Sequence, residues 1–412
     1  MCWPTARDHV AALYCLGRAV RGLCAEGRGA PAAQHQQQRA LHAEPTFAAL
    51  LAATLEAAPR LNAKGLSRVL LALGDTHEDL PFAHLSLPDA YTRLVLAIST
   101  SASERLLAGW SDGLAGGPCP DDRDLAFPLF ALARLGVYRP PVFRAASRLL
   151  ARKLEEPGGG LPAECLRQWL LACGAVGHRL APSEERAVAR CPPIHTWLES
   201  DSNRLHQLAG AAVVLRRPDP LLAALVREVN ARPPGQIQEA SRAEALYGLQ
   251  AMRLLATTGA LPTEARLDAA LAERLDAWLE EKSRRVRRRS RLERAVGAEL
   301  ERGGFQPTPD VSVGHGLSAD FRCLHRGQAF YVEVDGPSHY CVRPVGQPLG
   351  RTLLKRRLFA ALGLPLVPVP YWAAGLPGAS RAAERGGVEP LDLNVGEMAE
   401  EALSQLGAAG AA

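Results

Sequence analysis

Alternation of apolar and polar residues in the last third of the chain predicts a β-hairpin. In the segments 317–324 and 329–335 every second residue is apolar, and the residues between them are mostly polar or charged. A period of two places the two sets on opposite faces of a strand. Arg326-Gly327 lies between the two runs and has the length of a tight hairpin loop. With that loop, His325 pairs with Gln328.

The same register brings acidic residues together at the far end of the hairpin. Asp320 lies opposite Glu333, and Asp335 shares the face of Glu333. Gly336-Pro337 ends the strand, and His339 follows. Like charges directly opposite one another destabilise a strand pair, so this cluster requires a metal ion, an Arg or Lys, or a shared proton. The alternative is that the acids lie on a solvated face, and the pattern alone does not decide between the two.

A helical array is predicted before this hairpin, over residues 45–281. Apolar helical segments recur, each ending at Gly or a basic residue, and their ends at 136, 174, 215 and 254 are 38, 41 and 39 residues apart. A period near 40 built from helix pairs is typical of an α-solenoid, and a non-repetitive helical domain is the alternative. The recurring segments are 66–74, 125–136, 166–174, 205–215 and 246–254.

The residues on both sides of the hairpin complete a small α/β unit. A strand is expected near 305–313, and a helix over 351–362 ends at Gly363. A short buried strand follows at 366–369. The predicted order is a basic helix, three strands, a helix and a strand, arranged around a mixed sheet. The fold class is therefore mainly α, with helical repeats followed by a small α/β domain.

Residues 282–294 contain seven arginines and one lysine against Glu293 as the one acid. Such a density of positive charge repels itself unless phosphate or carboxylate partners are near, so we expect contacts to a nucleic-acid backbone. A solvated linker helix and a nuclear-localisation peptide are the alternatives. The residues expected to make these phosphate contacts are Arg284, Arg285, Arg287, Arg288, Arg289, Arg291, Lys355 and Arg356.

Composition narrows the class of protein. The 412 residues suffice for two or three domains, and the net charge is +5. The nine cysteines are dispersed and form no Cys-x-x-Cys pair, which favours a reducing compartment and argues against a structural zinc site. No apolar run reaches the length of a membrane span, so we expect no membrane partner. Residues 1–44 fit either a transit peptide or an ordinary first helix with a disordered loop.

Three separated motif elements in the predicted α/β unit resemble those of the RAP domain, the RNA-binding domain abundant in apicomplexans. This domain also forms the C-terminal end of the FAST kinase family of mitochondrial RNA regulators. They are Val332–Tyr340 (VEVDGPSHY), the residues Gly350, Thr352, Lys355, Arg356 and Leu358, and the segment from Leu362-Gly363 to Val367–Tyr371. The resemblance covers 305–372. It implies an organellar protein, mitochondrial or alternatively plastid, that binds RNA in transcript processing, stability, translation or ribosome assembly.

The RAP domain is in turn similar to nucleases of the PD-(D/E)xK, or restriction-endonuclease-like, fold. Asp320 and Glu333 match the two acids of that pattern, whereas Asp335 stands where the catalytic lysine is usual. Lys355 is the nearby lysine that could substitute, and His339 lies beside the acids in sequence. The resemblance thus implies an alternative function, a Mg²⁺-dependent endoribonuclease with Asp320, Glu333 and Asp335 as metal ligands.

A third alternative is a structural subunit of an organellar ribosome, with ribosomal RNA and proteins as partners. The expected domains are an extension over 1–44, the helical repeats over 45–281, the RAP domain with its basic leading helix over 282–374, and a tail with a short helix over 375–412.

Overall fold

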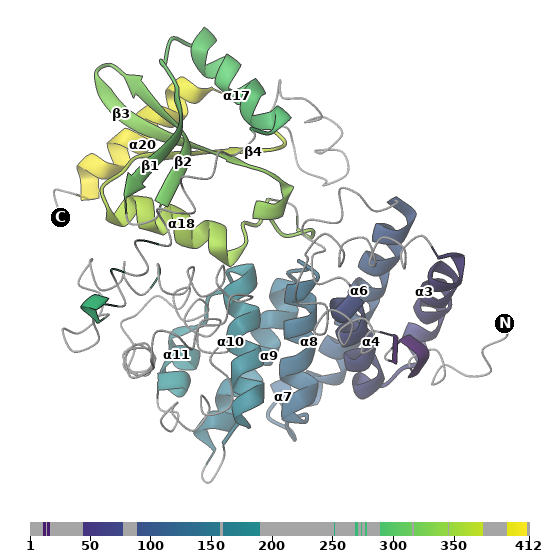
Figure 1. Cartoon of the computed structure of the whole chain (residues 1–412). Coiled ribbons are helices and arrows are strands. Elements are labelled where there is room, and N and C mark those ends of the chain that lie inside the picture. Colours follow the sequence, from purple (N-terminus) through teal and green to yellow (C-terminus); the bar gives the residue numbers. More distant parts are fainter. Residues whose placement is uncertain are drawn as a thin grey trace. The chain divides into compact units, whose positions relative to one another are not determined.

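The chain forms two compact units, residues 1–197 with 341–347, and residues 198–340 with 348–412. The structure is a computed structural model, drawn in Figure 1, and each unit is described by itself. It describes residues 11–13, 15–16, 44–76, 89–156, 160–189, 251, 268–270, 273, 277, 289–314, 317–344, 346–373 and 394–409.

The first unit is helical throughout its described part. Helix α8 packs against both α4 and α10, and α9 packs against α6, α8 and α11. The core is formed by large apolar side chains such as Trp110, Phe143 and Trp169. The helices are α3 (Pro45–Ala57), η1 (Ala58–Arg60), α4 (Ala63–Thr76), α6 (Asp89–Gly109), α7 (Ser111–Leu114), α8 (Asp122–Arg134), α9 (Pro140–Glu155), α10 (Ala163–Val176) and α11 (Pro182–Ala189).

Three of the five recurring segments are confirmed as helices, namely 66–74, 125–136 and 166–174. The segments 205–215 and 246–254 lie outside the described residues, apart from Ala251, so the 40-residue repeat stays a prediction. Two predicted ends are wrong. Helix α4 continues past Gly74 to Thr76, and α10 continues past Gly174, which is buried within it, to Val176. Gly177 follows α10, and its φ of 66° provides the left-handed cap that a residue without Cβ adopts readily.

The segment 341–347, which follows the hairpin in the chain, belongs to the helical unit. The Val342 amide donates to the Gly136 carbonyl at 2.7 Å, and the Tyr138 amide donates to the Arg343 carbonyl at 2.6 Å. Val137 and Arg343 thereby form a parallel β-bridge in the connection between α8 and α9. No period in the sequence signals this pairing, because a single bridge needs only two residues of extended backbone.

The described part of the second unit contains an α/β domain around a mixed four-stranded sheet, as predicted. The strand order is β1-β2-β3-β4, with two antiparallel pairs followed by a parallel pair between β3 and β4. The elements are α17 (Arg291–Arg302), β1 (Thr308–Gly314), β2 (Leu317–His325), β3 (Gln328–Asp335), η5 (Pro337–His339), α18 (Gly350–Ala361), β4 (Leu366–Pro370) and α20 (Val395–Ala409).

The hairpin register is confirmed, because His325 pairs with Gln328 across the β2–β3 loop. Arg326 and Gly327 in that loop have φ angles of 50° and 80°. Positive φ at both central residues defines the type I′ turn, whose twist matches that of the flanking strands. A two-residue loop of this kind fixes the pairing along the whole hairpin, including its acidic end.

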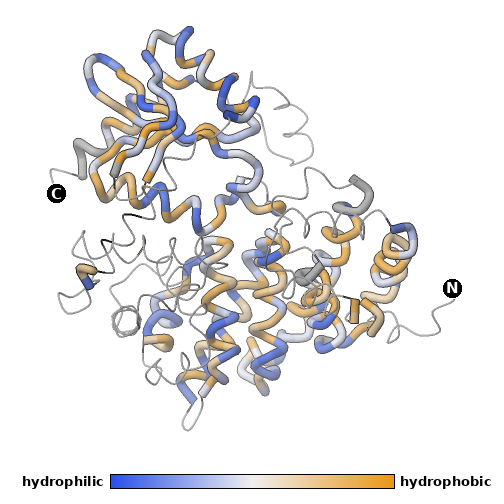
Figure 2. Tube along the Cα trace, viewed as in Figure 1, coloured by the Kyte–Doolittle hydropathy of each residue, from blue (hydrophilic) through white to orange (hydrophobic). Residues whose placement is uncertain are grey.

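Helices cover both faces of β3. Val332 and its alternate neighbours on β3 share a buried cluster with Val296 of α17 and with Val395 and Ala399 of α20. On the other face, the Tyr331 ring meets Phe359 of α18 at 5.7 Å between ring centroids. Figure 2 shows hydrophobic and hydrophilic positions alternating along these helices, as amphipathic packing requires. The helix expected in a C-terminal tail is therefore part of this core.

Among the helices that the structure describes, none combines the length and apolar character needed to cross a membrane.

Candidate functional site

The two carboxylates at the end of β3 are buried. Glu333 is 7% exposed and Asp335 is 1% exposed. They lie on the face of β3 that α18 covers, so the alternative of a solvated acidic face is wrong. Alternation along a strand shows which residues share a face, but it does not show whether another element covers that face.

Asp320 joins the two acids as the hairpin register predicted. Continuing the register by one residue beyond the Phe321–Val332 pair places Asp320 opposite Glu333. One carboxylate oxygen of Asp320 accepts a hydrogen bond from the Val334 amide at 2.7 Å. Burial, and then the negative charge of Glu333, raise the pKa of Asp320 to about 7. Part of the repulsion is thus relieved by a proton.

Two consecutive residues of α18 supply the cations that the cluster requires. The Lys355 ammonium contacts Oε1 of Glu333 at 2.5 Å, and the Arg356 guanidinium contacts Oδ2 of Asp335 at 2.6 Å. Leu354 and Leu358 bury the same helix in the domain, which holds the basic residues against β3. The sequence left open whether a metal ion, an Arg or Lys, or a shared proton relieves the repulsion among the acids. The structure shows that a lysine and an arginine contact two of them.

Asp335 has further partners beyond Arg356. The Tyr340 hydroxyl donates to Oδ2 at 3.2 Å, and Nδ1 of His339 lies 2.9 Å from Oδ1. Burial by itself would raise the pKa of Asp335, but hydrogen bonding from His339 and the charge of Arg356 outweigh it, so the pKa is lowered. Tyr340 was missed as a site residue, although it ends the segment Val332–Tyr340 that carries the family resemblance.

The start of α18 positions His339. The Leu349 amide donates to the His339 carbonyl at 2.9 Å, and the Thr352 hydroxyl donates to the same carbonyl at 3.1 Å. The Arg351 guanidinium donates to the neighbouring Ser338 carbonyl. Because the short η5 turn is tied down in this way, the imidazole is held beside Asp335 by backbone contacts.

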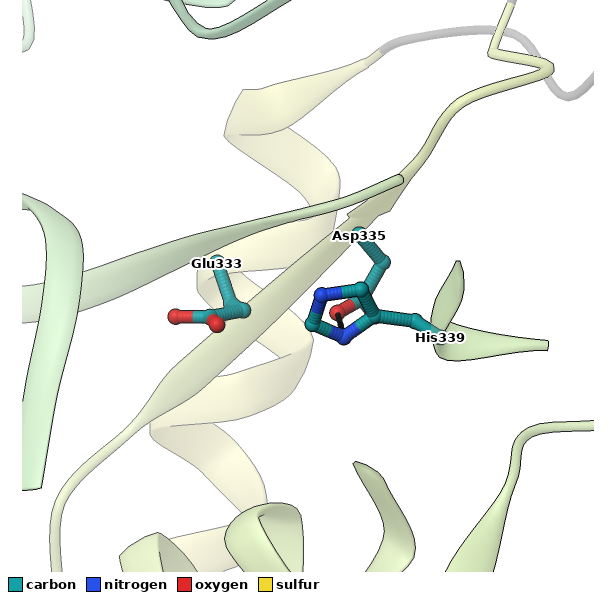
Figure 3. Close-up of side chains that lie close together, drawn as sticks. All are labelled: Glu333, Asp335 and His339. Atoms are coloured by element: carbon teal, nitrogen blue, oxygen red, sulfur yellow. Dashed lines mark ion pairs between the residues drawn. The ribbon is translucent and has the colours of Figure 1, made fainter. Parts of the chain in front are cut away.

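Glu333, Asp335 and His339 form the one group of metal-ligand type that the described part of the chain contains. One donor atom of each lies within 4.8 Å of the others, and Figure 3 shows the His339 ring beside the Asp335 carboxylate. Asp320, expected among the ligands, does not belong to this group. Within the described part, Oε2 of Glu333 has no hydrogen-bond partner, and Oδ1 of Asp335 contacts Nδ1 of His339. The donor types therefore fit a divalent cation.

The basic run is described only from Arg289 onward. Helix α17 begins at Arg291, where the Ser290 side chain and Glu293 form a reciprocal capping box. Arg289, Arg291 and Arg294 are exposed, and Arg289 lies 3.6 Å from the Asp310 carboxylate. The guanidinium of Arg294 donates to the Arg289 carbonyl at 3.0 Å. The predicted RNA contacts Arg284, Arg285, Arg287 and Arg288 lie outside the described residues.

Comparison with known families identifies the domain that contains this cluster. Residues 332–373 match the family model of the RAP domain, whereas a search of curated proteins found no match to the chain. The matched segment contains Glu333, Asp335, His339, Lys355 and Arg356. It ends before α20, so the structured domain is longer than the family match. This chain is a RAP-domain protein, with the domain in its C-terminal part.

Proposed function

We propose that this protein is an organellar RNA-binding protein. The observation that carries the proposal is the RAP-domain match over residues 332–373, because that domain indicates RNA binding. The buried network of Glu333, Asp335, Lys355 and Arg356 supports it by joining α18 to the sheet, since a rigid domain presents its surface groups in a fixed arrangement.

The start of α17 is the part of the described surface that we assign to phosphate contacts. The side chains of Arg291 and Arg294 are exposed, and the structure pairs neither with an acid among the described residues. Preceding them in the chain is the rest of the basic run, Arg284 to Arg289. Unpaired guanidinium groups bind phosphate oxygens and release counterions, which is the main source of sequence-independent affinity for nucleic acid.

Lys355 and Arg356, the other expected RNA contacts, already pair with buried carboxylates. Their side chains are partly exposed, so we assign them a supporting role in which they hold α18 in place and add positive charge to the domain. Their direct contact with RNA stays a prediction.

The test is the affinity for single-stranded RNA of the full chain with Arg291→Gln and Arg294→Gln. We expect binding about tenfold weaker, because two phosphate contacts are lost. A matched control carries Arg302→Gln and Arg326→Gln, which remove the same charge from arginines that pair with Glu299 and Glu400. Equal losses in both double variants would show that the start of α17 is not the contact, and undetectable RNA binding by the unmodified chain would refute the proposal.

The cellular role has three parts that separate experiments address. Imaging of the tagged full chain tests the mitochondrial assignment against the plastid one. Crosslinking in cells followed by sequencing identifies the RNA and distinguishes transcript processing, stability or translation from ribosome assembly. Co-sedimentation with organellar ribosomal particles at high salt tests the alternative of a ribosomal subunit, because a free RNA binder dissociates under those conditions.

A Mg²⁺-dependent endoribonuclease of restriction-endonuclease-like fold is the second candidate. The observation that favours it is the contact of Lys355 with Glu333, which places an amine beside the acid pair although Asp335 occupies the usual lysine position. In this candidate Asp320, Glu333 and Asp335 would hold Mg²⁺, which would polarise a phosphate oxygen. Metal-dependent cutting of labelled RNA that is lost with EDTA and with Asp335→Asn is the expected result. If the RNA stays uncut at saturating protein concentration, the nuclease candidate is rejected and RNA binding without catalysis remains.

A further inference from the structure

Each of the two buried carboxylates on β3 uses one oxygen for a basic residue of α18, which leaves its second oxygen for another partner. Oε1 of Glu333 contacts Lys355, and Oδ2 of Asp335 contacts Arg356 and Tyr340. Within the described part of the chain, Oε2 of Glu333 has no hydrogen-bond partner, whereas Oδ1 of Asp335 lies 2.9 Å from Nδ1 of His339. Buried polar atoms are nearly always paired with protein, water or an ion, so the unpaired Oε2 of Glu333 near the Asp335–His339 pair indicates a bound ligand.

We infer that Glu333, Asp335 and His339 bind a divalent first-row transition ion through Oε2, Oδ1 and Nδ1 respectively. One donor atom from each residue lies within 4.8 Å of the others. Bonds of about 2.1 Å limit two ligands of one ion to a separation of about 4 Å. The Asp335–His339 pair, at 2.9 Å, already satisfies that limit (Figure 3), so a small rotation of the Glu333 side chain completes the set.

The ligand set decides the class of ion. Mg²⁺ prefers an octahedron of oxygen ligands and keeps several waters, whereas an imidazole nitrogen beside two carboxylates suits ions such as Mn²⁺ and Zn²⁺. Lys355 holds Oε1 of Glu333, and Arg356 holds Oδ2 of Asp335. These contacts orient the two remaining oxygens, Oε2 and Oδ1, toward the proposed ion. The charges of Lys355 and Arg356 also balance those of the carboxylates, so an added ion gains no net negative charge from these four residues and we expect moderate affinity.

The experiment uses Mn²⁺ and the full chain in the absence of RNA, so its outcome is separate from that of the proposed function. Mn²⁺ is the probe because Zn²⁺ would also bind among the nine cysteines. We expect saturable binding, measured from the electron paramagnetic resonance signal of the unbound ion, and little displacement by tenfold more Mg²⁺. Pulsed measurements on the bound ion should detect coupling to an imidazole nitrogen.

Two variants and a control test the ligands. His339→Gln should weaken Mn²⁺ binding by about tenfold or more, because a nitrogen ligand is lost. Lys355→Met should also weaken it by about tenfold, because Glu333 loses the contact that orients its free oxygen. His325→Gln, at the hairpin loop beside Glu400, should leave binding unchanged.

Three results would overturn the inference. They are a lack of saturable Mn²⁺ binding by the unmodified chain, bound Mn²⁺ without nitrogen coupling, and displacement by an equal concentration of Mg²⁺. The last would indicate a site made of oxygen ligands. The nitrogen-coupling measurement uses the unmodified chain, so it tests for an imidazole ligand even where His339→Gln impairs folding.

Discussion

At the scale of single residues, the acidic cluster shows how the surroundings shift the pKa values of two nearby aspartates in opposite directions. The pKa of Asp320 is raised to about 7 by burial and by the charge of Glu333. The pKa of Asp335 is lowered, because His339 and Arg356 stabilise its charged form against the effect of burial. The sequence shows three similar acids, but their partners on α18 and η5 decide which of them keeps a proton.

Arg356 should be among the residues most important for stability of the RAP domain. Arg356→Met leaves Asp335, which is 1% exposed, without its guanidinium partner, and we expect a loss of about 3 kcal/mol in unfolding free energy. Urea denaturation measures it. The double variant Asp335→Asn with Arg356→Met should lose less than Arg356→Met alone, because the uncompensated charge is gone. A control, Arg357→Met at an exposed position of α18, should lose less than about 1 kcal/mol.

His178 in the helical unit should make stability depend on pH. It is buried, with Nδ1 3.0 Å from the Tyr138 hydroxyl, and burial followed by the charge of Arg144 lowers its pKa to about 4. The unfolded chain binds this proton near pH 6.5, so the contribution is fully present above that pH and decreases as the pH falls toward 4. We expect a loss of about 2 kcal/mol between pH 7.5 and pH 5.

Denaturant unfolding of the full chain at the two pH values measures this effect. The variant His178→Gln cannot take up the proton, so its stability should change less over the same range. An identical pH dependence in the variant and the unmodified chain would assign the effect to other groups.

At the scale of secondary-structure elements, the helices around β3 determine the environment of each of its two faces. Helices α17 and α20 pack on Val332 and its alternate neighbours, whereas α18 covers Glu333 and Asp335. Alternation and turn chemistry made the hairpin and the order of elements predictable. The role of α20 was not predictable, because residues 375–412 read as a tail and the packing of α20 on β3 and β4 joins residues far apart in sequence.

The core contribution of α20 predicts the effect of a polar substitution in it. Ala399 is fully buried beside the sheet, so Ala399→Asp places a carboxylate in an apolar cluster and should destabilise the domain by about 3 kcal/mol or more. Ala298→Asp makes the same change at an exposed position of α17 and should cost less than about 1 kcal/mol. Thermal unfolding compares the two, and similar midpoints would show that α20 is not part of the folded core.

At the scale of the whole molecule, the chain combines a helical unit with a RAP-domain unit, and its net charge of +5 is concentrated in the basic run that precedes α17. Such a distribution predicts affinity that depends steeply on salt. The logarithm of the RNA association constant should fall linearly with the logarithm of salt concentration.

Removing two phosphate contacts should reduce that dependence by a defined amount. With Arg291→Gln and Arg294→Gln, the slope should become shallower by about 1.4, since each contact to single-stranded nucleic acid contributes about 0.7. Titrations at four or five salt concentrations measure both slopes. Parallel lines for the variant and the unmodified chain would indicate that these arginines do not contact phosphate.

The sequence by itself determined what depends on near neighbours in the chain: the helices at 66–74, 125–136 and 166–174, the hairpin with its His325–Gln328 pairing, and the opposition of Asp320 to Glu333. Period, turn residues and register are local, so they can be read without the fold. Only the tertiary structure decided that α18 buries the acids, that Lys355 and Arg356 neutralise them, and that α20 completes the core. Those contacts join residues far apart in sequence, and no local pattern specifies which elements meet.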